Sequence, residues 1–285
     1  MVVVGKVDSA KDFRHFLKEL DVKGVVFVVK PNWSNANTFT SAETLDWLFS
    51  ALKGRIKVIE GYTAWRNELN TGPEPQEVIT PSNAKAKWQW IKEQDKWFLR
   101  FSGIDKILSK YDVEYINVTE EVWSNRTLNP DEVRDFVDNK YGILVRQEVY
   151  SFVPTKVYEL RDSTFISLNN SRRIREHVSL STKNLFGLIP DPARYGKWHG
   201  KNDSYLSRSI VDINKIYRSL FSPCYWINEM KELGVFVGSK NSVEADAVTA
   251  KLMGIDPGKI DYLRKVANIF GGYDEKVLTK IPKSL

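Results

Sequence analysis

The stretch VVFVVKPNWSN (residues 25–35) decides how the rest of the sequence is interpreted. Its apolar run up to Val29 predicts a strand buried on both faces, because a half-exposed strand would alternate apolar and polar residues. Lys30 and Asn32 follow at the strand end, and Pro31 between them lacks the N–H that a continuing ladder needs. The stretch therefore predicts a buried parallel strand that presents polar groups at its carboxyl end.

Amphipathic helices and apolar strands alternate along the rest of the chain. Helices are expected over residues 13–20, 40–54, 84–111, 204–221, 242–254 and 257–270, and one more begins at 129. Strands are expected over residues 24–30, 55–61, 113–118, 142–153 and 163–168. Such alternation implies parallel pairing with crossover helices. The prediction is an α/β fold with mostly parallel sheets and two lobes around a cleft, namely residues 1–150 and 151–285, although no linker marks that boundary and one domain is the alternative.

Two helix starts have recognisable capping residues. Thr40 and Glu43 have the spacing of a capping box, which predicts that Thr40 caps the second helix. Asn129 followed by Pro130 is the pattern that helix starts prefer.

Composition limits the classes of protein to consider. The 285 residues carry a net charge of +6, which is compatible with anionic metabolites or nucleic acid as partners. No apolar run approaches the roughly 20 residues of a membrane span, and only residues 2–4 of the N-terminus are apolar, so no secretory signal is expected. A single cysteine, Cys224, excludes an internal disulfide and any iron–sulfur cluster built on several thiolates. We expect a cytoplasmic protein of undetermined oligomeric state.

The first candidate site lies at the predicted strand ends. Lys30 offers a positive charge, Asn32 offers a donor and an acceptor, and the following helix start offers unpaired amides. Glu60 ends the second strand and is the acidic candidate there. Together these groups suit a carboxylate or phosphate ligand, with a solvated strand end as the alternative interpretation.

The second candidate site lies in HVSLSTKNLFGLIPDPARYGKWHG (residues 177–200). Lys183 and Asn184 repeat the lysine and amide of the first site, and Gly187 leaves room for a ligand to approach the backbone. His199 titrates near neutrality when unperturbed and is a candidate general acid or base. Lys183, when desolvated, is a second candidate for proton transfer.

A carboxylate on a largely apolar helix completes the candidates. Asp246 lies between Val243 and Val248, and burying it without partners would cost several kcal/mol, so it is either partnered or functional. No metal site is predicted, because His177 and His199 have no carboxylate at a ligand spacing.

The motifs VVFVVKPNW, SLSTKNLFGLIP with a histidine after it, SIVDI and VEADAVTAKLMGIDP occur in this order. From residue 25 to 272, the chain resembles domain-of-unknown-function family 362, which has no agreed activity. The family's occasional ferredoxin-like module is not expected here. A more distant similarity links the chain to nickel-pincer lactate racemases, with Lys183 and His199 as the matching positions. The glycine-rich run of the racemases is missing, and SRRIREH departs from the family's usual pattern.

Three functions follow as hypotheses. The first is an enzyme acting on a small anionic metabolite held by Lys30 and Asn32, with Asn184 orienting it, Lys183 and His199 transferring protons, and Glu60 or Asp246 in support. The cofactor is unknown. The second is a nucleic-acid-binding protein that uses the arginines of residues 172–175 and the tryptophan-rich residues 85–100. The third is a non-catalytic accessory protein.

Overall fold

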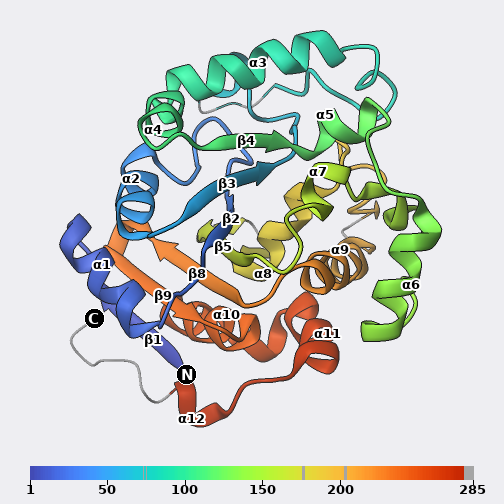
Figure 1. Ribbon diagram of the computed structural model, residues 1–285. Coiled ribbons are helices and arrows are strands. Elements are labelled where there is room, and N and C mark those ends of the chain that lie inside the picture. Colours follow the sequence, from blue (N-terminus) through green and yellow to red (C-terminus); the bar gives the residue numbers. More distant parts are fainter. Residues whose placement is uncertain (73, 75, 175–176, 202–203, 279–285) are drawn as a thin grey trace.

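The computed structural model describes residues 1–278 except 73, 75, 175–176 and 202–203 (Figure 1). A seven-stranded sheet forms the centre of the molecule, with the strand order β1-β9-β8-β5-β2-β3-β4. Its strands are β1 (Val2–Lys6), β2 (Val26–Pro31), β3 (Arg55–Glu60), β4 (Glu114–Asn117), β5 (Thr164–Asn170), β8 (Cys224–Met230) and β9 (Val235–Ser239). All neighbouring pairs from β4 to β8 are parallel, whereas β9 is antiparallel to both β8 and β1. The predicted α/β class with a mostly parallel sheet is confirmed.

Strands from both halves of the chain join in this one sheet. β2 pairs with β5, and the register places Val29 beside Ile166. The predicted boundary at residue 150 falls inside a 3-10 turn, η2 (Gln147–Phe152). The two predicted lobes are therefore not separate sheets in the described part of the chain. The other described sheet is a small hairpin of β6 (Arg172–Ile174) and β7 (His177–Ser179).

Helices cover both faces of the sheet (Figure 1). One face packs against α1 (Ala10–Glu19), α2 (Ala42–Ala51), α3 (Trp88–Phe101) and α4 (Ile104–Lys110). The other packs against α5 (Val118–Trp123), α6 (Pro130–Tyr141), α7 (Thr155–Tyr158), α8 (Ser181–Asn184), α9 (Leu206–Leu220), α10 (Ser242–Leu252), α11 (Asp261–Phe270) and α12 (Glu275–Leu278). Phe27 and Val29 join the first core and Val28 the second, as the alternating directions of strand side chains require. None of the described helices has the length and apolar character needed to cross a membrane.

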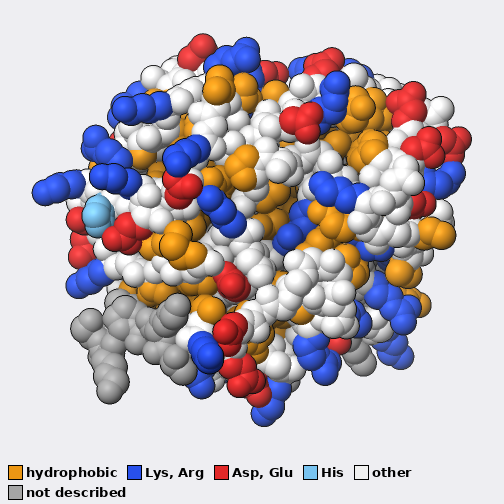
Figure 2. All heavy atoms as spheres, turned by 60° about the horizontal axis from the view of Figure 1, so that its bottom comes forward, with side chains coloured by type: hydrophobic (Ala, Val, Ile, Leu, Met, Phe, Trp, Pro, Cys, Tyr) orange, Lys and Arg blue, Asp and Glu red, His pale blue; other side chains and the backbone are white. Residues whose placement is uncertain are grey.

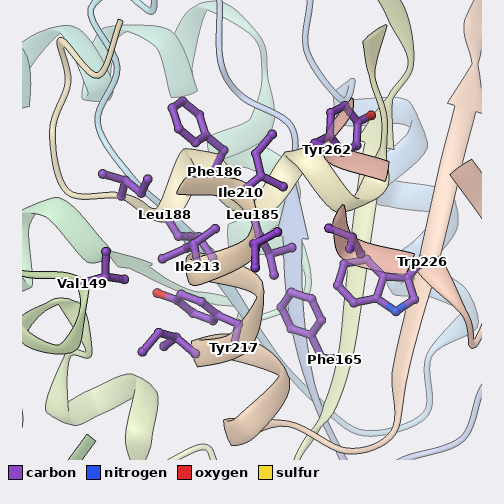
Figure 3. Close-up of a cluster of buried hydrophobic side chains, with 14 of the residues drawn as sticks. Val149, Phe165, Leu185, Phe186, Leu188, Ile210, Ile213, Tyr217, Trp226 and Tyr262 are labelled. Atoms are coloured by element: carbon purple, nitrogen blue, oxygen red, sulfur yellow. The ribbon is translucent and has the colours of Figure 1, made fainter. Parts of the chain in front are cut away.

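The second core shows how the sequence pattern becomes packing (Figure 3). Ile210, Ile213 and Tyr217 recur at helical spacing along α9 and are buried. They lie in the same cluster as Phe165 of β5 and Trp226 of β8, where they cover the sheet. The apolar stripe that the sequence predicts for this helix is confirmed.

Two helix predictions need correction. The N-cap of α2 is Ser41, whose side chain accepts from Thr44 N. Thr40 Oγ1 instead accepts from Asn32 N at 2.9 Å and so fixes the turn after β2. The helix predicted over residues 84–111 is divided into α3 and α4 at Gly103, whose φ of 71° lies in the left-handed region.

The strand predicted over residues 142–153 is wrong. Val145 N and Arg146 N donate to the Asp212 carboxylate at 3.1 and 2.8 Å. Leu144 N donates to Tyr150 Oη at 2.9 Å. Because side chains take these backbone donors, the segment needs no neighbouring strand and forms a loop that leads into η2.

The connections reverse direction between β2 and β5. From β2 the chain moves outward through β3 to β4, with helices α2, α3 and α4 on one face. It returns to β5 on the other side of β2 and continues through α8 and α9, on the opposite face, to β8. This arrangement creates a topological switch point, where α/β sheets open a crevice at the carboxyl ends of the strands.

Candidate functional site

A cavity of about 590 Å³ lies at this switch point. The loops after β2 and β3 form one part of its wall, and the segment from α8 to His199 forms another. The described lining residues are Lys30, Asn32, Trp33, Ser34, Asn35, Glu60, Gly61, Thr63, Trp65, Arg172, Ser179, Lys183, Asn184, Phe186, Gly187, Arg194, Tyr195 and His199.

The structure brings most of the sequence candidates together around this cavity. Its lining includes Lys30, Asn32, Glu60, Lys183, Asn184 and His199, although they come from three distant parts of the chain. Asp246 is not among the described lining residues. The catalytic or ligand-binding role of each residue stays a prediction.

A buried ion pair forms the floor of the cavity. Lys30 Nζ donates to Glu60 Oε2 at 2.8 Å and to the Pro31 carbonyl at 2.7 Å. Its third N–H is directed at Asn184 Oδ1, 3.1 Å away. An ammonium group has three N–H donors, so Lys30 contributes charge to the cavity and no unused donor. Burial lowers the pKa of Lys30 to about 8, while Glu60 opposes that shift.

Glu60 is held by donors from two loops. Its Oε2 accepts from Trp33 N at 3.0 Å in addition to Lys30, and its Oε1 accepts from Gly61 N at 2.9 Å. These bonds tie the end of β3 to the end of β2. A methyl group on Gly187 would stand 3.0 Å from Glu60 Oε1 and 3.1 Å from Lys30 Nζ. The glycine therefore leaves the ion pair open to the cavity.

The two predicted asparagines are anchored within the fold. Asn32 Nδ2 donates to Asn169 Oδ1 at 2.7 Å and so bridges the carboxyl ends of β2 and β5. Asn184 Nδ2 donates to the Lys30 carbonyl at 2.9 Å and to Ser167 Oγ at 3.1 Å. These bonds fix the position of both amides on the wall of the cavity.

Two arginines add positive charge that the sequence did not assign to the site. Arg194 is 5% exposed and donates through Nη2 to the carbonyls of Tyr62, Gly187 and Ile189. Arg172 donates to Ser34 Oγ at 2.8 Å. Neither guanidinium pairs with a carboxylate among the described residues, and each has a buried Nε without a hydrogen-bond partner. Burial lowers the pKa of both side chains from the usual arginine value.

Aromatic side chains surround the predicted acid–base residue. The ring of His199 stacks on Tyr195, with centroids 4.6 Å apart, and meets Phe186 edge-on at 5.0 Å. His199 is 9% exposed, whereas Tyr195 is 45% exposed, so the histidine lies deeper than the tyrosine. Trp65 packs perpendicular to Tyr195 at 5.8 Å. The sequence analysis did not assign Trp65 or Tyr195 to the site. Trp65 lies in the loop after the second predicted strand, and because ligands of α/β sheets bind at the carboxyl ends of strands, this position could have indicated it.

Asp246 lies outside the described lining of the cavity and holds the start of α8. Its carboxylate is fully buried and accepts from Ser181 Oγ at 2.6 Å, Ser181 N at 3.0 Å and Thr182 N at 3.1 Å. Asn228 Nδ2 adds a bond of 2.9 Å. Burial raises the pKa of Asp246 despite these donors. The aspartate therefore fixes the start of α8, the helix that carries Lys183 and Asn184.

Comparisons with family models, curated proteins and solved structures give no match to this chain. The resemblance to family 362 and to the racemases stays a prediction. Within the part of the chain that the structure describes, no group of three or more His, Cys, Asp or Glu side chains is placed to hold a metal ion.

Proposed function

We propose that the cavity binds a small anionic metabolite, a carboxylate or a phosphate, and that Lys183 and His199 transfer protons on it. The observation that carries the proposal is the pair of arginines, Arg172 and Arg194. The Nε of each is buried beside the cavity without a hydrogen-bond partner, and neither guanidinium forms an ion pair with a carboxylate among the described residues. A buried cation without a counterion is costly, and a bound anion would remove that cost.

The overall charge of the lining supports the same ligand class. Lys30, Arg172, Lys183 and Arg194 are its described cations, and Glu60 is its described carboxylate. Since Glu60 pairs with Lys30, the charges of Arg172 and Arg194 favour a positive potential in the cavity. Charges in a concave site with low-dielectric walls act more strongly than charges on an open surface.

The position of the cavity also supports a small-molecule site. Ligands of open α/β sheets bind outside the carboxyl ends of the strands at a switch point. Lys183 and His199 both line the cavity, which is the placement that proton transfer to a bound ligand requires.

Three of the side chains behind the nucleic-acid hypothesis have partners in the structure, whereas Arg173 is exposed and Arg175 lies outside the described residues. Arg172 bonds to Ser34 inside the cavity, and Trp88 donates to Glu120 Oε2 at 2.8 Å. Trp97 stacks on Phe101. On the face in Figure 2, Lys and Arg side chains lie interspersed with Asp and Glu and form no continuous stripe. Nucleic-acid binding stays an alternative, and its test is affinity that falls steeply with salt.

Isothermal titration with inorganic phosphate and with pyruvate tests anion binding. Arg172→Gln should weaken binding by about 10- to 100-fold, the value of a hydrogen bond between charged groups. Arg173→Gln is the matched control, because this neighbour is exposed on β6 and does not line the cavity. Absence of binding to every anion, or equal loss in both variants, would contradict the proposal.

Gly187→Ala tests whether the ligand reaches the floor. The added methyl group occupies the space in front of Lys30 and Glu60, so anion affinity should fall while the far-UV spectrum stays unchanged. Gly272→Ala is the control, because nothing lies within 4 Å of its added methyl group. Equal affinity in the two variants would place the ligand elsewhere.

Proton transfer is tested by solvent-deuterium incorporation into pyruvate, followed by NMR. Lys183→Ala and His199→Gln should abolish enzyme-dependent incorporation, because these groups would exchange the proton. Lys197→Ala is the control, since this exposed lysine of the same segment does not line the cavity. Incorporation that survives both site variants would remove these residues from the proposed chemistry.

A further inference from the structure

The cavity is larger than an anionic group alone requires. Its volume of about 590 Å³ lies within the range of about 300–1,000 Å³ that encloses whole small-molecule ligands. A phosphate or carboxylate at the arginines fills only part of that space. The side chains that line the rest of the cavity therefore indicate the chemical nature of the remainder of the ligand.

Two aromatic rings form a right-angled corner in that wall. Trp65 and Tyr195 have ring centroids 5.8 Å apart and an interplanar angle of 79°. A flat ring that stacks on one of them presents its edge to the other, and both geometries are favourable between aromatic groups. The corner is thus complementary to a planar aromatic ring and less so to a puckered aliphatic one.

Contacts with neighbouring groups hold both rings of the corner in place. His199 stacks on Tyr195 at 4.6 Å and 30°, which fixes the plane of the tyrosine ring. The Trp65 carbonyl accepts from Ala36 N at 3.2 Å, and Trp65 N donates to Thr63 Oγ1 at 3.5 Å, which hold the loop that carries the indole. A rigid recognition surface loses little entropy on binding.

The positive charge of Arg194 and the aromatic corner lie at different depths in the cavity. Arg194 is 5% exposed, whereas Tyr195 is 45% exposed, so the guanidinium lies inside and the aromatic corner lies toward solvent. Arg172 lines the same cavity and donates to Ser34 Oγ at 2.8 Å. A ligand that uses both regions has an anionic group at its inner end and a flat ring at its outer end.

We infer that the ligand of this cavity is an aromatic or heteroaromatic anion whose ring lies in the corner of Trp65 and Tyr195. The inference rests on the proposed function and adds the chemical class of the ligand. Aromatic pairs of this geometry are worth a factor of about 2 to 12 in affinity beyond the area they bury. This factor is the quantity that the experiment measures.

The experiment compares probes that differ only in the ring. Phenyl phosphate is titrated against cyclohexyl phosphate, and benzoate against cyclohexanecarboxylate, by calorimetry with the full chain. The charge and approximate size are equal within each pair, so the ratio of affinities isolates the aromatic contribution. We expect the aryl member of at least one pair to bind about fivefold more tightly.

Variants locate the source of the preference. Trp65→Leu and Tyr195→Leu should abolish the aryl preference, and Tyr195→Phe should retain it, because the ring and not the hydroxyl is used. Trp97→Leu is the control, since this indole stacks on Phe101 in α3 and does not line the cavity. The control should leave the ratio unchanged.

The outcomes separate this inference from the proposed function. Equal binding of aryl and cyclohexyl probes, with Arg172→Gln still weakening both, would overturn the inference and leave anion binding intact. A preference that survives Trp65→Leu and Tyr195→Leu would also overturn it. Failure of all four probes together with inorganic phosphate and pyruvate would overturn both proposals.

Discussion

Replacement of Lys30 by methionine should lower the free energy of unfolding by about 3–5 kcal/mol, the usual cost of removing one partner of a buried ion pair. Lys30 Nζ lies 2.8 Å from Glu60 Oε2, and the two side chains are 1% and 4% exposed. Methionine keeps most of the volume of the lysine stem. The loss therefore reports on the charge of Glu60, which stays buried without its cation.

A more exposed pair between β3 and β4 provides the control. Lys57 Nζ lies 2.8 Å from Glu114 Oε2, the same distance, but the side chains are 27% and 44% exposed. Solvent screens this pair, so Lys57→Met should cost only about 0–1 kcal/mol. The difference between the two variants measures the effect of burial at a constant distance.

Urea unfolding followed by tryptophan fluorescence measures both variants at pH 7. A difference below about 1 kcal/mol would refute the argument that burial sets the cost. Adding Glu60→Gln to Lys30→Met should recover part of the loss, because it removes the stranded charge. A double variant less stable than the sum of its parts would count against the pairing.

The dependence of the free energy of unfolding on pH provides a second test with Lys30→Met. The pKa of Lys30 in the folded protein is lowered to about 8, below the value of about 10.4 in an unfolded chain. The unfolded state thus binds the proton more tightly, so at pH values below 8 the folded protein holds Lys30 in a charged form that burial disfavours relative to the neutral amine. That penalty should lift as the pH rises from 8 to 10 in the wild-type protein, and Lys30→Met should remove this rise.

Three further outcomes follow from buried groups. Asp246→Ala should lower the free energy of unfolding by about 2–5 kcal/mol, because the groups that donate to Asp246 lose a charged acceptor. Asp135 is exposed, so Asp135→Ala should change the free energy of unfolding by less than about 0.5 kcal/mol in the same urea titration. Burial raises the pKa of Glu229 to about 7. The stability that the protonated carboxyl contributes is therefore lost as the pH rises from about 4.5 through 7. Glu229→Gln should reduce the dependence of the free energy of unfolding on pH between pH 5 and 8. Burial raises the pKa of Cys224 to about 11, so Ellman's reagent at pH 8 should modify it at least about a hundredfold more slowly in the folded than in the urea-unfolded protein.

The sequence predicted the four parallel strands β2, β3, β4 and β5 and the meeting of the ends of β2 and β3. The apolar run before Lys30 and the one before Glu60 identify adjacent buried strands, and parallel neighbours bring their carboxyl ends to the same edge. Lys30 and Glu60 therefore had to lie close together once the sheet was assumed. The helices with strong apolar periodicity, such as α9, were predicted for the same local reason.

Long-range partners explain what the sequence could not predict. The sequence analysis did not predict β8 and β9. Asn228 interrupts the apolar pattern of β8, because it is a buried polar residue whose partner is Asp246. Arg194 lies in a proline-containing loop, and its role depends on carbonyls of Tyr62 and Gly187 that pattern analysis does not connect to it. Only the tertiary contacts identify these residues.

One uninterrupted stretch, residues 181–199, supplies the predicted proton-transfer groups, the buried arginine and one half of the aromatic corner. The sheet contributes the ion pair beneath them, and that pair is bonded to the framework on every side. In the proposed function, Arg172 and Trp65 from other parts of the chain would complete the site. Exchanging residues 181–199 as a block would therefore also disturb the packing of the molecule, because Leu185 and Leu188 of the same stretch are fully buried.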